Sequence, residues 1–577
     1  MKPEDSRYTN IDKTLHAAMS KLTSGLSPSA LMAAYADWAV HLASSPGKQS
    51  HLIEKAARKS LRLAGFIGES TEQKSQNGPC IEPLPFDKRF SDEAWKKWPF
   101  NLLYQSFLLN QQWWSNATTG VHGTTKQHEN VMEFATRQVL DIFSPSNYLL
   151  TNPQLIEQTK KEGGQNLVRG MQNFIEDMQR TIGNKKPAGA EHFTVGKNLA
   201  VSPGKIVYRN KLMELIQYEP ITDQVHPEPI LIVPAWIMKY YILDLSKQNS
   251  LVKFLTEQGF TVFMISWKNP TEDDRNIGMS DYRELGVMEA IDTVSTITVN
   301  AKIHGIGYCL GGTLLSIAAA AMSRDNDDRI QTLTLLATQV DFSEAGELML
   351  FINESQVSFL EDMMWEQGYL DAKEMAGAFQ LLRSNDLIWS RIVHDYLMGE
   401  RTPVNDLMAW NFDTTRMPYK MHSQYLRKLF LDNDLAEGRY LVDDKPISIS
   451  DIRVPTFVVG TQKDHVAPWH SVYKFHLLSD TDVTFLLTSG GHNAGIVSEP
   501  GHPHRTYQIA TTKKEAKYTD PESWTEKQKN HKGSWWPELS TWLQSHSSDL
   551  TTPPTLAAPK KKIEVICDAP GTYVMQN

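Results

Sequence analysis

The sequence contains few cysteines, and their positions argue against two common ways of stabilising a fold. Only three occur in 577 residues, Cys80, Cys309 and Cys567, and they lie far apart in the chain. No Cys-x-x-Cys pair is present, so neither a disulfide framework nor a zinc site is indicated. We therefore expect a protein of the reducing cytoplasm that binds no metal.

Long apolar runs, a surplus of basic residues and internal repeats are also absent. The longest apolar runs, at 314–322 and 333–340, are far shorter than the roughly 18–20 residues that span a bilayer. The first ten residues lack the basic and apolar regions of a signal peptide. The formal net charge of -9 and the pI near 6.1 argue against a nucleic-acid partner. These features predict a globular protein without a transmembrane segment.

The length of the chain predicts two domains, because one hydrophobic core rarely serves 577 residues. Residues 1–190 have mostly helical patterns, beginning with a helix that Ser27 caps and Pro28 opens. The polar stretch 183–190 contains glycine and proline and predicts the boundary. Residues 191–577 are expected to form the second domain.

An aromatic stripe runs through 95–114 of the helical region, from Trp95 to Trp114. Two interpretations remain open for it. The stripe packs against the rest of the protein, or it adheres to an apolar partner surface such as a lipid or a polymer.

In residues 191–577, apolar runs alternate with helical patterns. This alternation predicts a parallel sheet covered by helices on both faces, the α/β class. Asn210–Lys211 separates the first two runs and predicts a hairpin. Residues 342–442 interrupt the alternation with helical patterns, so we expect a cap above the carboxyl ends of the strands. Strands are expected at 205–208, 213–218, 229–233, 261–266, 302–306, 330–336, 456–460 and 483–487, and helices at 240–258, 280–299 and 312–322.

The run 303–312 combines a buried strand, a glycine-bounded turn and the start of an alanine-rich helix. Its turn, Gly307-x-Cys309-x-Gly311, matches the nucleophile elbow with cysteine in place of serine. Glycine is required on both sides because side chains there would collide with the sheet and the helix. A buried structural cysteine at a strand–helix corner is the alternative interpretation.

Two titratable residues follow later strands in the order that an α/β-hydrolase triad requires. Asp464 comes after the strand expected at 456–460, and His492 comes after that at 483–487. Ligands of parallel sheets bind at the carboxyl ends of strands, where all three residues are expected. We predict that His492 removes the proton of Cys309 and that Asp464 fixes the tautomer of His492. His465 is expected to have a supporting role.

The position of Cys309 at the start of a helix favours the thiolate, because the helix dipole and a histidine partner both lower a thiol pKa. A thiolate suits thioester exchange. The backbone N–H of Leu310 is expected to stabilise the oxyanion, together with a second N–H from the loop after 229–233. That second donor is Ala235 or Trp236, and the sequence does not distinguish them.

Several stretches together resemble the polyhydroxyalkanoate synthases, of the single-subunit, class I-like type. The resemblance covers almost the whole chain, including helical stretches at 25–49 and 95–114. It departs from the more familiar members at 234–236, where Pro234 is followed by Ala-Trp and not by a second proline. This departure leaves the assignment of the oxyanion loop undecided. The matching stretches are 233–245, 259–267, 307–312, 464–469, 489–495, 533–537 and 569–574.

The resemblance implies an α/β-hydrolase fold with a helical cap insertion, preceded by a mostly helical N-terminal domain that supports granule association and dimerisation. It also implies transfer of a 3-hydroxyacyl group from coenzyme A to Cys309 and attack by the 3-hydroxyl of another acyl unit. The expected partners are 3-hydroxyacyl-CoA, the surface of a cytoplasmic polyester granule with its associated proteins, and a second copy of the chain. No cofactor is expected, since coenzyme A is the carrier and product. Asp464 either orients His492 or activates the incoming hydroxyl.

Two other functions remain as alternatives. A cysteine thioesterase or depolymerase would use the same triad with water as the acceptor. A catalytically silent protein that coats granules would keep the hydrolase frame as a scaffold.

Overall fold

The computed structural model describes residues 3–23, 25–71, 78–85, 87–371, 374 and 388–576. The chain forms two compact units. Unit 1 comprises Met1–Leu22, Gly189–Met375 and Val404–Asn577, and unit 2 comprises Thr23–Ala188 and Ala376–Pro403.

The described part of unit 2 is helical and contains no strand. Its α2 begins at Pro28, and the Ser27 hydroxyl accepts a hydrogen bond from the N–H of Ala30, as the sequence predicts. The last helix before the boundary, α7, ends at Ile182 with Gly183 as its C-cap. The helices are α2 (Pro28–Ala43), α3 (Pro46–Thr71), α4 (Phe100–Thr118), α5 (Lys126–Ile142), α6 (Pro153–Lys161), α7 (Gln165–Ile182), the 3-10 turns Glu93–Lys96 and Pro145–Asn147, and the π-helical turn Ile392–Leu397.

Much of the aromatic stripe forms a small core inside unit 2. Trp95 is fully buried, and its ring meets that of Phe90 edge-on with the centroids 5.0 Å apart. Tyr104 stacks on Phe90 at 5.4 Å, and Phe107 packs on the same ring at 5.9 Å. Packing therefore accounts for these side chains, whereas Trp98 is 70% exposed.

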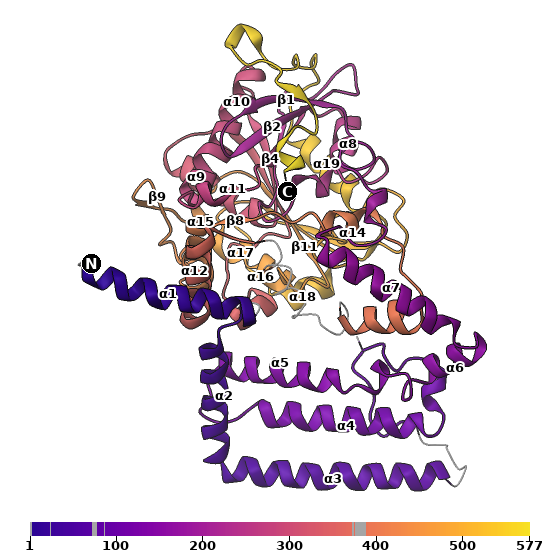
Figure 1. The fold of residues 1–577 in the computed structure, drawn as a ribbon. Coiled ribbons are helices and arrows are strands. Elements are labelled where there is room, and N and C mark those ends of the chain that lie inside the picture. The colour runs from indigo at the N-terminus through magenta and orange to yellow at the C-terminus, as the bar shows by residue number, and fades with distance from the viewer. Residues whose placement is uncertain are drawn as a thin grey trace. The chain divides into compact units, whose positions relative to one another are not determined.

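Unit 1 is built on an eleven-stranded sheet (Figure 1). Its six central strands, β4-β3-β5-β6-β11-β12, are parallel, and the strands beyond them are antiparallel. All the strands expected from the sequence are present, including the hairpin of β1 and β2. The strands, in spatial order, are β14 (His531–Lys532), β13 (Thr506–Thr512), β12 (Val483–Thr488), β11 (Thr456–Thr461), β6 (Ile330–Leu336), β5 (Ile303–Tyr308), β3 (Ile230–Val233), β4 (Val262–Trp267), β2 (Met213–Tyr218), β1 (Gly204–Arg209) and β15 (Cys567–Asp568).

Two features of the sheet region differ from the sequence prediction. The helix expected at 240–258 is in fact a 3-10 turn, Tyr240–Leu243, followed by a loop and by α8 (Leu251–Glu257). The break occurs because Ser250 caps α8, accepting a hydrogen bond from the N–H of Lys253. The antiparallel strands β13, β14 and β15 were not predicted, since their apolar residues are few and interspersed with polar ones.

Helices flank the sheet of unit 1 (Figure 1), and the predicted helix at 280–299 contains a π-helical segment at Tyr282–Met288. The predicted helix at 312–322 begins earlier, at Leu310. These helices are α9 (Met279–Asp281), α10 (Glu289–Ile297), α11 (Leu310–Arg324), α16 (Trp469–Tyr473), α17 (Phe475–Leu478), α18 (Pro521–Lys527) and α19 (Trp536–Ser545).

The described part of the expected cap is mainly helical. Unlike the prediction, it also contains the short strands β7 (Tyr369–Leu370) and β8 (Met417–Pro418), which pair with each other. A third, β9 (Leu441–Val442), pairs with β10 (Lys445–Pro446), which lies just beyond the cap. Its helices in unit 1 are α12 (Glu354–Gln367), α14 (Asp406–Asn411), α15 (Tyr419–Tyr425) and the π-helical turn Leu426–Leu431.

Two segments belong to a different unit from the one that the predicted domains, 1–190 and 191–577, would assign to them. The first turns of the chain, in α1 (Pro3–Thr23), belong to unit 1, where His16 Nδ1 lies 2.7 Å from Asp362 Oδ2 of α12. Residues 376–403 belong to unit 2, where the Asn166 side chain donates to the Leu397 carbonyl at 2.8 Å. Both groupings depend on contacts between segments that are far apart in sequence.

Candidate active site

Cys309 lies between β5 and α11 in a backbone conformation that L-residues rarely adopt, with φ 52° and ψ -125°. The flanking glycines allow it. A β-carbon at Gly307 would lie 2.3 Å from the Gly312 α-carbon, and one at Gly311 would lie 2.1 Å from the Val233 carbonyl oxygen. The turn therefore has the close packing that the sequence pattern predicts.

A third glycine, Gly312, is also required at this turn. A β-carbon there would lie 1.9 Å from Thr338 Oγ1. Sequence reasoning gave it no role, although the Gly-Gly pair was a signal for it.

His492 and Asp464 form a hydrogen-bonded pair on the loops after β12 and β11. His492 Nδ1 lies 2.8 Å from Asp464 Oδ2. Asp464 also accepts hydrogen bonds from the Thr461 hydroxyl at 2.8 Å and from the N–H groups of Val466 and Ala467 at 2.9 and 2.8 Å. Burial opposes ionisation of Asp464, but the His492 charge and these hydrogen bonds hold its carboxyl pKa below the usual value.

Cys309 lies near enough to His492 to act on the pKa of its ring. Since Nδ1 faces Asp464, Nε2 is the ring nitrogen left for the thiol. Burial acts to lower the pKa of His492, but the charges of Asp464 and Cys309 and the hydrogen bonds to them outweigh it and raise the pKa above that of free histidine. The charged, imidazolium form of His492 is thus favoured at this position.

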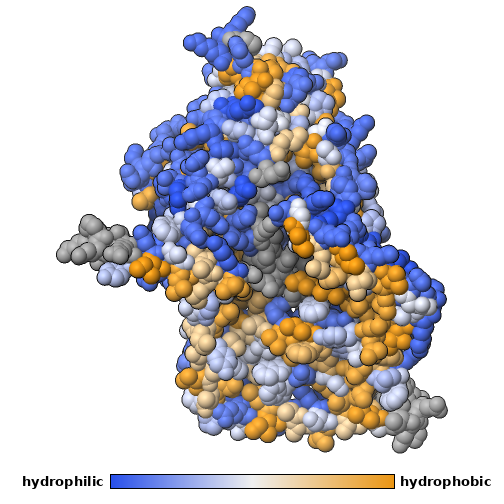
Figure 2. Space-filling model, in the orientation of Figure 1, coloured by the Kyte–Doolittle hydropathy of each residue, from blue (hydrophilic) through white to orange (hydrophobic). Residues whose placement is uncertain are grey.

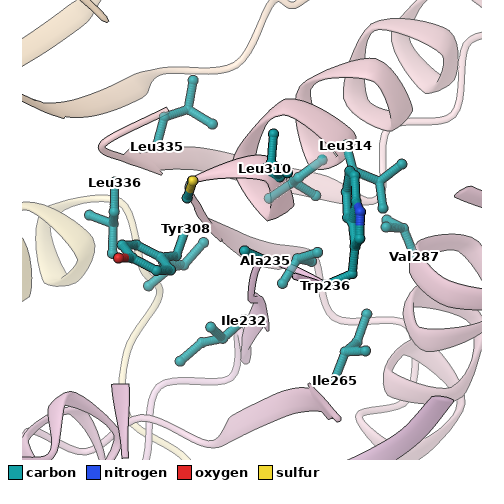
Figure 3. Packing of buried hydrophobic residues seen from close by; sticks show 14 of the residues in the cluster. Ile232, Ala235, Trp236, Ile265, Val287, Tyr308, Leu310, Leu314, Leu335 and Leu336 are labelled. Carbon is teal, nitrogen blue, oxygen red and sulfur yellow. The ribbon is translucent and has the colours of Figure 1, made fainter. Parts of the chain in front are cut away.

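The loop that follows β3 lies directly against the elbow. The hypothetical β-carbon at Gly311 would meet both Val233 and Pro234, so the backbones of the two segments are in contact. Leu310 is the first residue of α11, and its N–H therefore has no carbonyl partner within the helix. Figure 3 shows Tyr308, Leu310 and Ala235 around the end of β5.

Both candidates for the second oxyanion donor, Ala235 and Trp236, are buried, at 5% and 1% exposure. The Trp236 ring packs against Tyr282 with centroids 5.3 Å apart and against Tyr425 of α15 at 6.4 Å. The Trp236 carbonyl accepts a hydrogen bond from the Thr415 hydroxyl at 2.5 Å. These contacts hold the loop between the sheet and the cap, and the choice between its two N–H groups stays open.

His465 adjoins Asp464 in sequence but has an exposed side chain. Among the hydrogen bonds of the described residues, none joins its ring to Cys309, Asp464 or His492. Its supporting role remains a prediction.

Three further side chains surround the site and were not predicted. The Tyr308 hydroxyl donates to Asn493 Oδ1 at 2.6 Å, and the Tyr308 ring lies 5.7 Å from that of His492. Tyr308 and Asn493 adjoin Cys309 and His492 in sequence, and this adjacency was the signal that could have identified them. Tyr425 is near enough for the charge of Cys309 to add to burial in raising its pKa. No local pattern marks Tyr425, because α15 reaches the site only through the folding of the cap.

The described residues contain neither a candidate membrane span nor a candidate metal site. No helix there combines the length and hydropathy needed to cross a membrane. No group of three or more His, Cys, Asp or Glu side chains in the same ranges has a metal-binding arrangement.

Comparison with protein families identifies the class of unit 1. Residues 228–498 match the model of the alpha/beta hydrolase fold, as the parallel sheet, the elbow and the order of the three residues predict. Residues 86–255 match the model of the "Poly-beta-hydroxybutyrate polymerase (PhaC) N-terminus", and residues 6–48 match the "Poly-beta-hydroxybutyrate polymerase N terminal" model.

Similar proteins extend the match over most of the chain. A poly(3-hydroxyalkanoate) polymerase of Methylorubrum extorquens is 40% identical over 503 residues, which are 86% of this chain and 82% of that protein. The polymerase subunit PhaC of Rhizobium meliloti is 36% identical, covering 91% and 85% of the two chains, and that of Cupriavidus necator is 34% identical, covering 85% and 83%. The chain belongs to the poly(3-hydroxyalkanoate) polymerase family of enzymes.

Proposed function

We propose that this enzyme polymerises 3-hydroxyacyl-CoA into a polyester through an acyl group bound to Cys309. The observation that carries the proposal is the Asp464–His492 hydrogen bond beside Cys309, in a chain 34–40% identical to polymerases of poly(3-hydroxyalkanoate).

The first step loads the enzyme. His492 Nε2 takes the thiol proton, and the Cys309 sulfur attacks the thioester carbonyl of the substrate. The N–H of Leu310 and that of Ala235 or Trp236 stabilise the oxyanion. Coenzyme A then leaves with the proton from His492. One thioester replaces another, so the step needs no energy source and no further cofactor.

The second step lengthens the chain. A 3-hydroxyl group of another acyl unit gives its proton to His492 and attacks the carbonyl of the Cys309 thioester. An ester bond forms, the carbon–sulfur bond breaks, and the proton returns to the sulfur. For Asp464 we propose the orienting role, which its enclosure by Thr461, Val466 and Ala467 supports.

The rival hydrolytic reaction would use water as the acceptor. Cys309 is only 9% exposed, and the side chains of Tyr308, Trp236 and Tyr425 near it are buried. An enclosed, aromatic site disfavours bulk water and so favours an organic hydroxyl as the acceptor.

We also propose that the enzyme acts on cytoplasmic polymer granules as a homodimer and that unit 2 provides the granule contact. Figure 2 shows hydrophobic residues gathered on the visible face of unit 2. In α7, the side chains of Val168, Met171, Ile175 and Ile182 are 51%, 59%, 47% and 78% exposed, respectively. Apolar surface of this kind suits adhesion to a polyester.

The test is incubation of purified enzyme with 3-hydroxybutyryl-CoA, measuring free coenzyme A and insoluble polymer. We expect both from the wild type and neither from Cys309→Ala. Peptide mass mapping should find the acyl group on Cys309 and not on Cys80 or Cys567. Soluble 3-hydroxy acid without polymer would establish the hydrolase instead, and the absence of coenzyme A release from the wild type would favour the silent scaffold.

A further inference from the structure

The segment Thr572–Gln576 makes two contacts close to the candidate active site. The Gln576 side-chain oxygen accepts a hydrogen bond from the N–H of Asn269 at 3.0 Å. The Gln576 carbonyl accepts another from the Lys239 ammonium group. Asn269 and Lys239 are 4% and 6% exposed, so both contacts lie inside unit 1.

Lys239 ends the loop that carries the two candidate oxyanion donors. The preceding residues of this loop are held by the cap segment Asp413–Thr415. The Ile237 carbonyl accepts from the N–H of Thr415 at 3.2 Å, and the N–H of Lys239 donates to the Asp413 carbonyl at 3.3 Å. The indole of Trp410 donates to the Lys239 carbonyl at 2.8 Å.

Asn269 connects the same cap segment back to Gln576. Its side-chain oxygen accepts from the N–H of Arg416, the residue after Thr415, at 2.9 Å. The contacts therefore form a closed ring that runs from the oxyanion loop to the cap, to Asn269, to Gln576 and back through Lys239.

The residues that precede Gln576 are held against strand β2 of the sheet. The carboxylate of Glu214, on β2, is fully buried and accepts hydrogen bonds from the N–H groups of Thr572 and Tyr573, both at 3.0 Å. The Tyr573 hydroxyl donates to the Asn210 carbonyl at 2.6 Å. The ring thus ties the oxyanion loop to the hairpin of β1 and β2.

We propose that Gln576 is a positioning residue, which holds the loop Ala235–Lys239 at the distance where its N–H can bind the oxyanion. This inference rests on the proposed function. Oxyanion stabilisation depends steeply on geometry, because the donor must lie about 2.7–3.1 Å from the developing charge. A supporting contact that fixes the loop to within about 0.5 Å is therefore needed for the rate of acyl transfer.

The test compares two reactions of the same thiol. Acylation of Cys309 by 3-hydroxybutyryl-CoA passes through an oxyanion. Alkylation by iodoacetamide does not, since the sulfur displaces iodide directly and the thiol proton passes to His492. A defect of the oxyanion loop slows the first reaction alone, whereas a general disturbance of the site slows both.

For Gln576→Leu we expect the maximal rate of acylation to fall about 10- to 100-fold, with KM near the wild-type value and alkylation within about twofold. Gln576→Glu keeps an acceptor of the same shape and should restore most of the rate. Met575→Gln changes a 52% exposed neighbour and should behave as the wild type. If Gln576→Leu does not fold, Gln576→Asn, which shortens the reach by one methylene, should show a smaller fall of the same kind.

Equal acylation rates in the wild type and Gln576→Leu, or a parallel loss of acylation and alkylation, would overturn the inference while leaving the proposed function intact. A wild-type enzyme that forms no acyl group on Cys309 would overturn the proposed function, and this inference with it.

Discussion

Asp464 uses both of its carboxylate oxygens within the fold. Oδ2 accepts from His492 and Thr461, and Oδ1 accepts from the backbone of Val466 and Ala467. Its side chain has no exposed surface. A carboxylate held in this way is suited to orient an imidazole and has little access to a second substrate.

Replacing Asp464 by asparagine should therefore lower acylation and elongation together, by about 10³- to 10⁴-fold, because the wrong histidine tautomer is stabilised. Single-turnover acylation and polymer growth on a preloaded enzyme measure the two steps separately. Thr461→Val, which removes one hydrogen bond to the carboxylate, serves as a milder control. Acylation that persists without elongation would instead assign Asp464 to the incoming hydroxyl.

Arg89 forms the enclosed ion pairs of unit 2. Its guanidinium donates to both oxygens of Asp87, at 2.9 and 2.8 Å, and to Asp141 at 2.7 Å. The three side chains are 13%, 8% and 6% exposed. Removing the cation would leave two buried carboxylates without their partner.

We expect Arg89→Ala to lower the free energy of unfolding of unit 2 by about 3–5 kcal/mol. Lys96→Ala breaks an exposed pair, in which the Lys96 and Glu93 side chains are 67% and 80% exposed, and should leave the stability nearly unchanged. Urea unfolding, followed by the signal of the buried Trp95, measures both. Similar effects of the two variants would contradict this account.

Among the elements, the elbow between β5 and α11 is the most sensitive to volume. Gly307, Gly311 and Gly312 each lie against atoms that a β-carbon would overlap, and two of these neighbours are backbone. Gly305, two residues earlier on β5, faces only the mobile end of Leu315, at 3.2 Å. The same strand thus contains a test position and its control.

Gly307→Ala should destabilise the protein by several kcal/mol or prevent folding, because backbone must move. Gly305→Ala should change stability by no more than about 1 kcal/mol, since a leucine side chain can shift. Thermal unfolding and the rate of Cys309 alkylation report the two effects. Equal behaviour of the two variants would mean that the elbow is looser than its geometry indicates.

The elements that the sequence predicted correctly are those with strong local signals. The strands of the parallel sheet are continuous apolar runs, and the elbow is marked by glycines at fixed spacing. The prediction of one helix at 240–258 was wrong. The apolar spacing continues across a loop, and α8 begins only after its N-cap residue, Ser250. The antiparallel strand β13 had no such run, since an antiparallel strand can face solvent on one side and needs apolar residues only on the other.

At the scale of the whole molecule, two buried histidines make stability depend on pH. His304 hydrogen-bonds to Thr332 and Ser547, and burial lowers its pKa to about 4. Burial also lowers the pKa of His422 to about 4. Their unfolded value is 6.5. The unfolded chain therefore binds more protons between pH 4 and 6.5, and stability falls as pH falls through that window.

We expect each histidine to contribute about 3 kcal/mol of stability at neutral pH that is fully lost below about pH 4. The melting temperature should decrease between pH 7.5 and 5.0, and His422→Phe should show a smaller decrease. His192→Phe, at an exposed position of unit 1, is the control and should match the wild type. A decrease of equal size in His422→Phe would remove His422 as a cause.

The amino-acid sequence was enough to predict the fold class, the family and the order Cys309, Asp464, His492. Each of these residues directly follows a strand whose apolar run is recognisable, and parallel strands bring their carboxyl ends to one edge. Local pattern and sheet geometry were therefore sufficient for the three side chains.

The surroundings of these three side chains depend on how the whole chain folds. Tyr425 reaches the site from the cap, and Gln576 reaches the oxyanion loop through Asn269 and Lys239. The grouping of residues 376–403 with unit 2 is likewise decided in three dimensions. These contacts join segments more than a hundred residues apart through single hydrogen bonds and side-chain packing, which leave no periodic pattern in the chain.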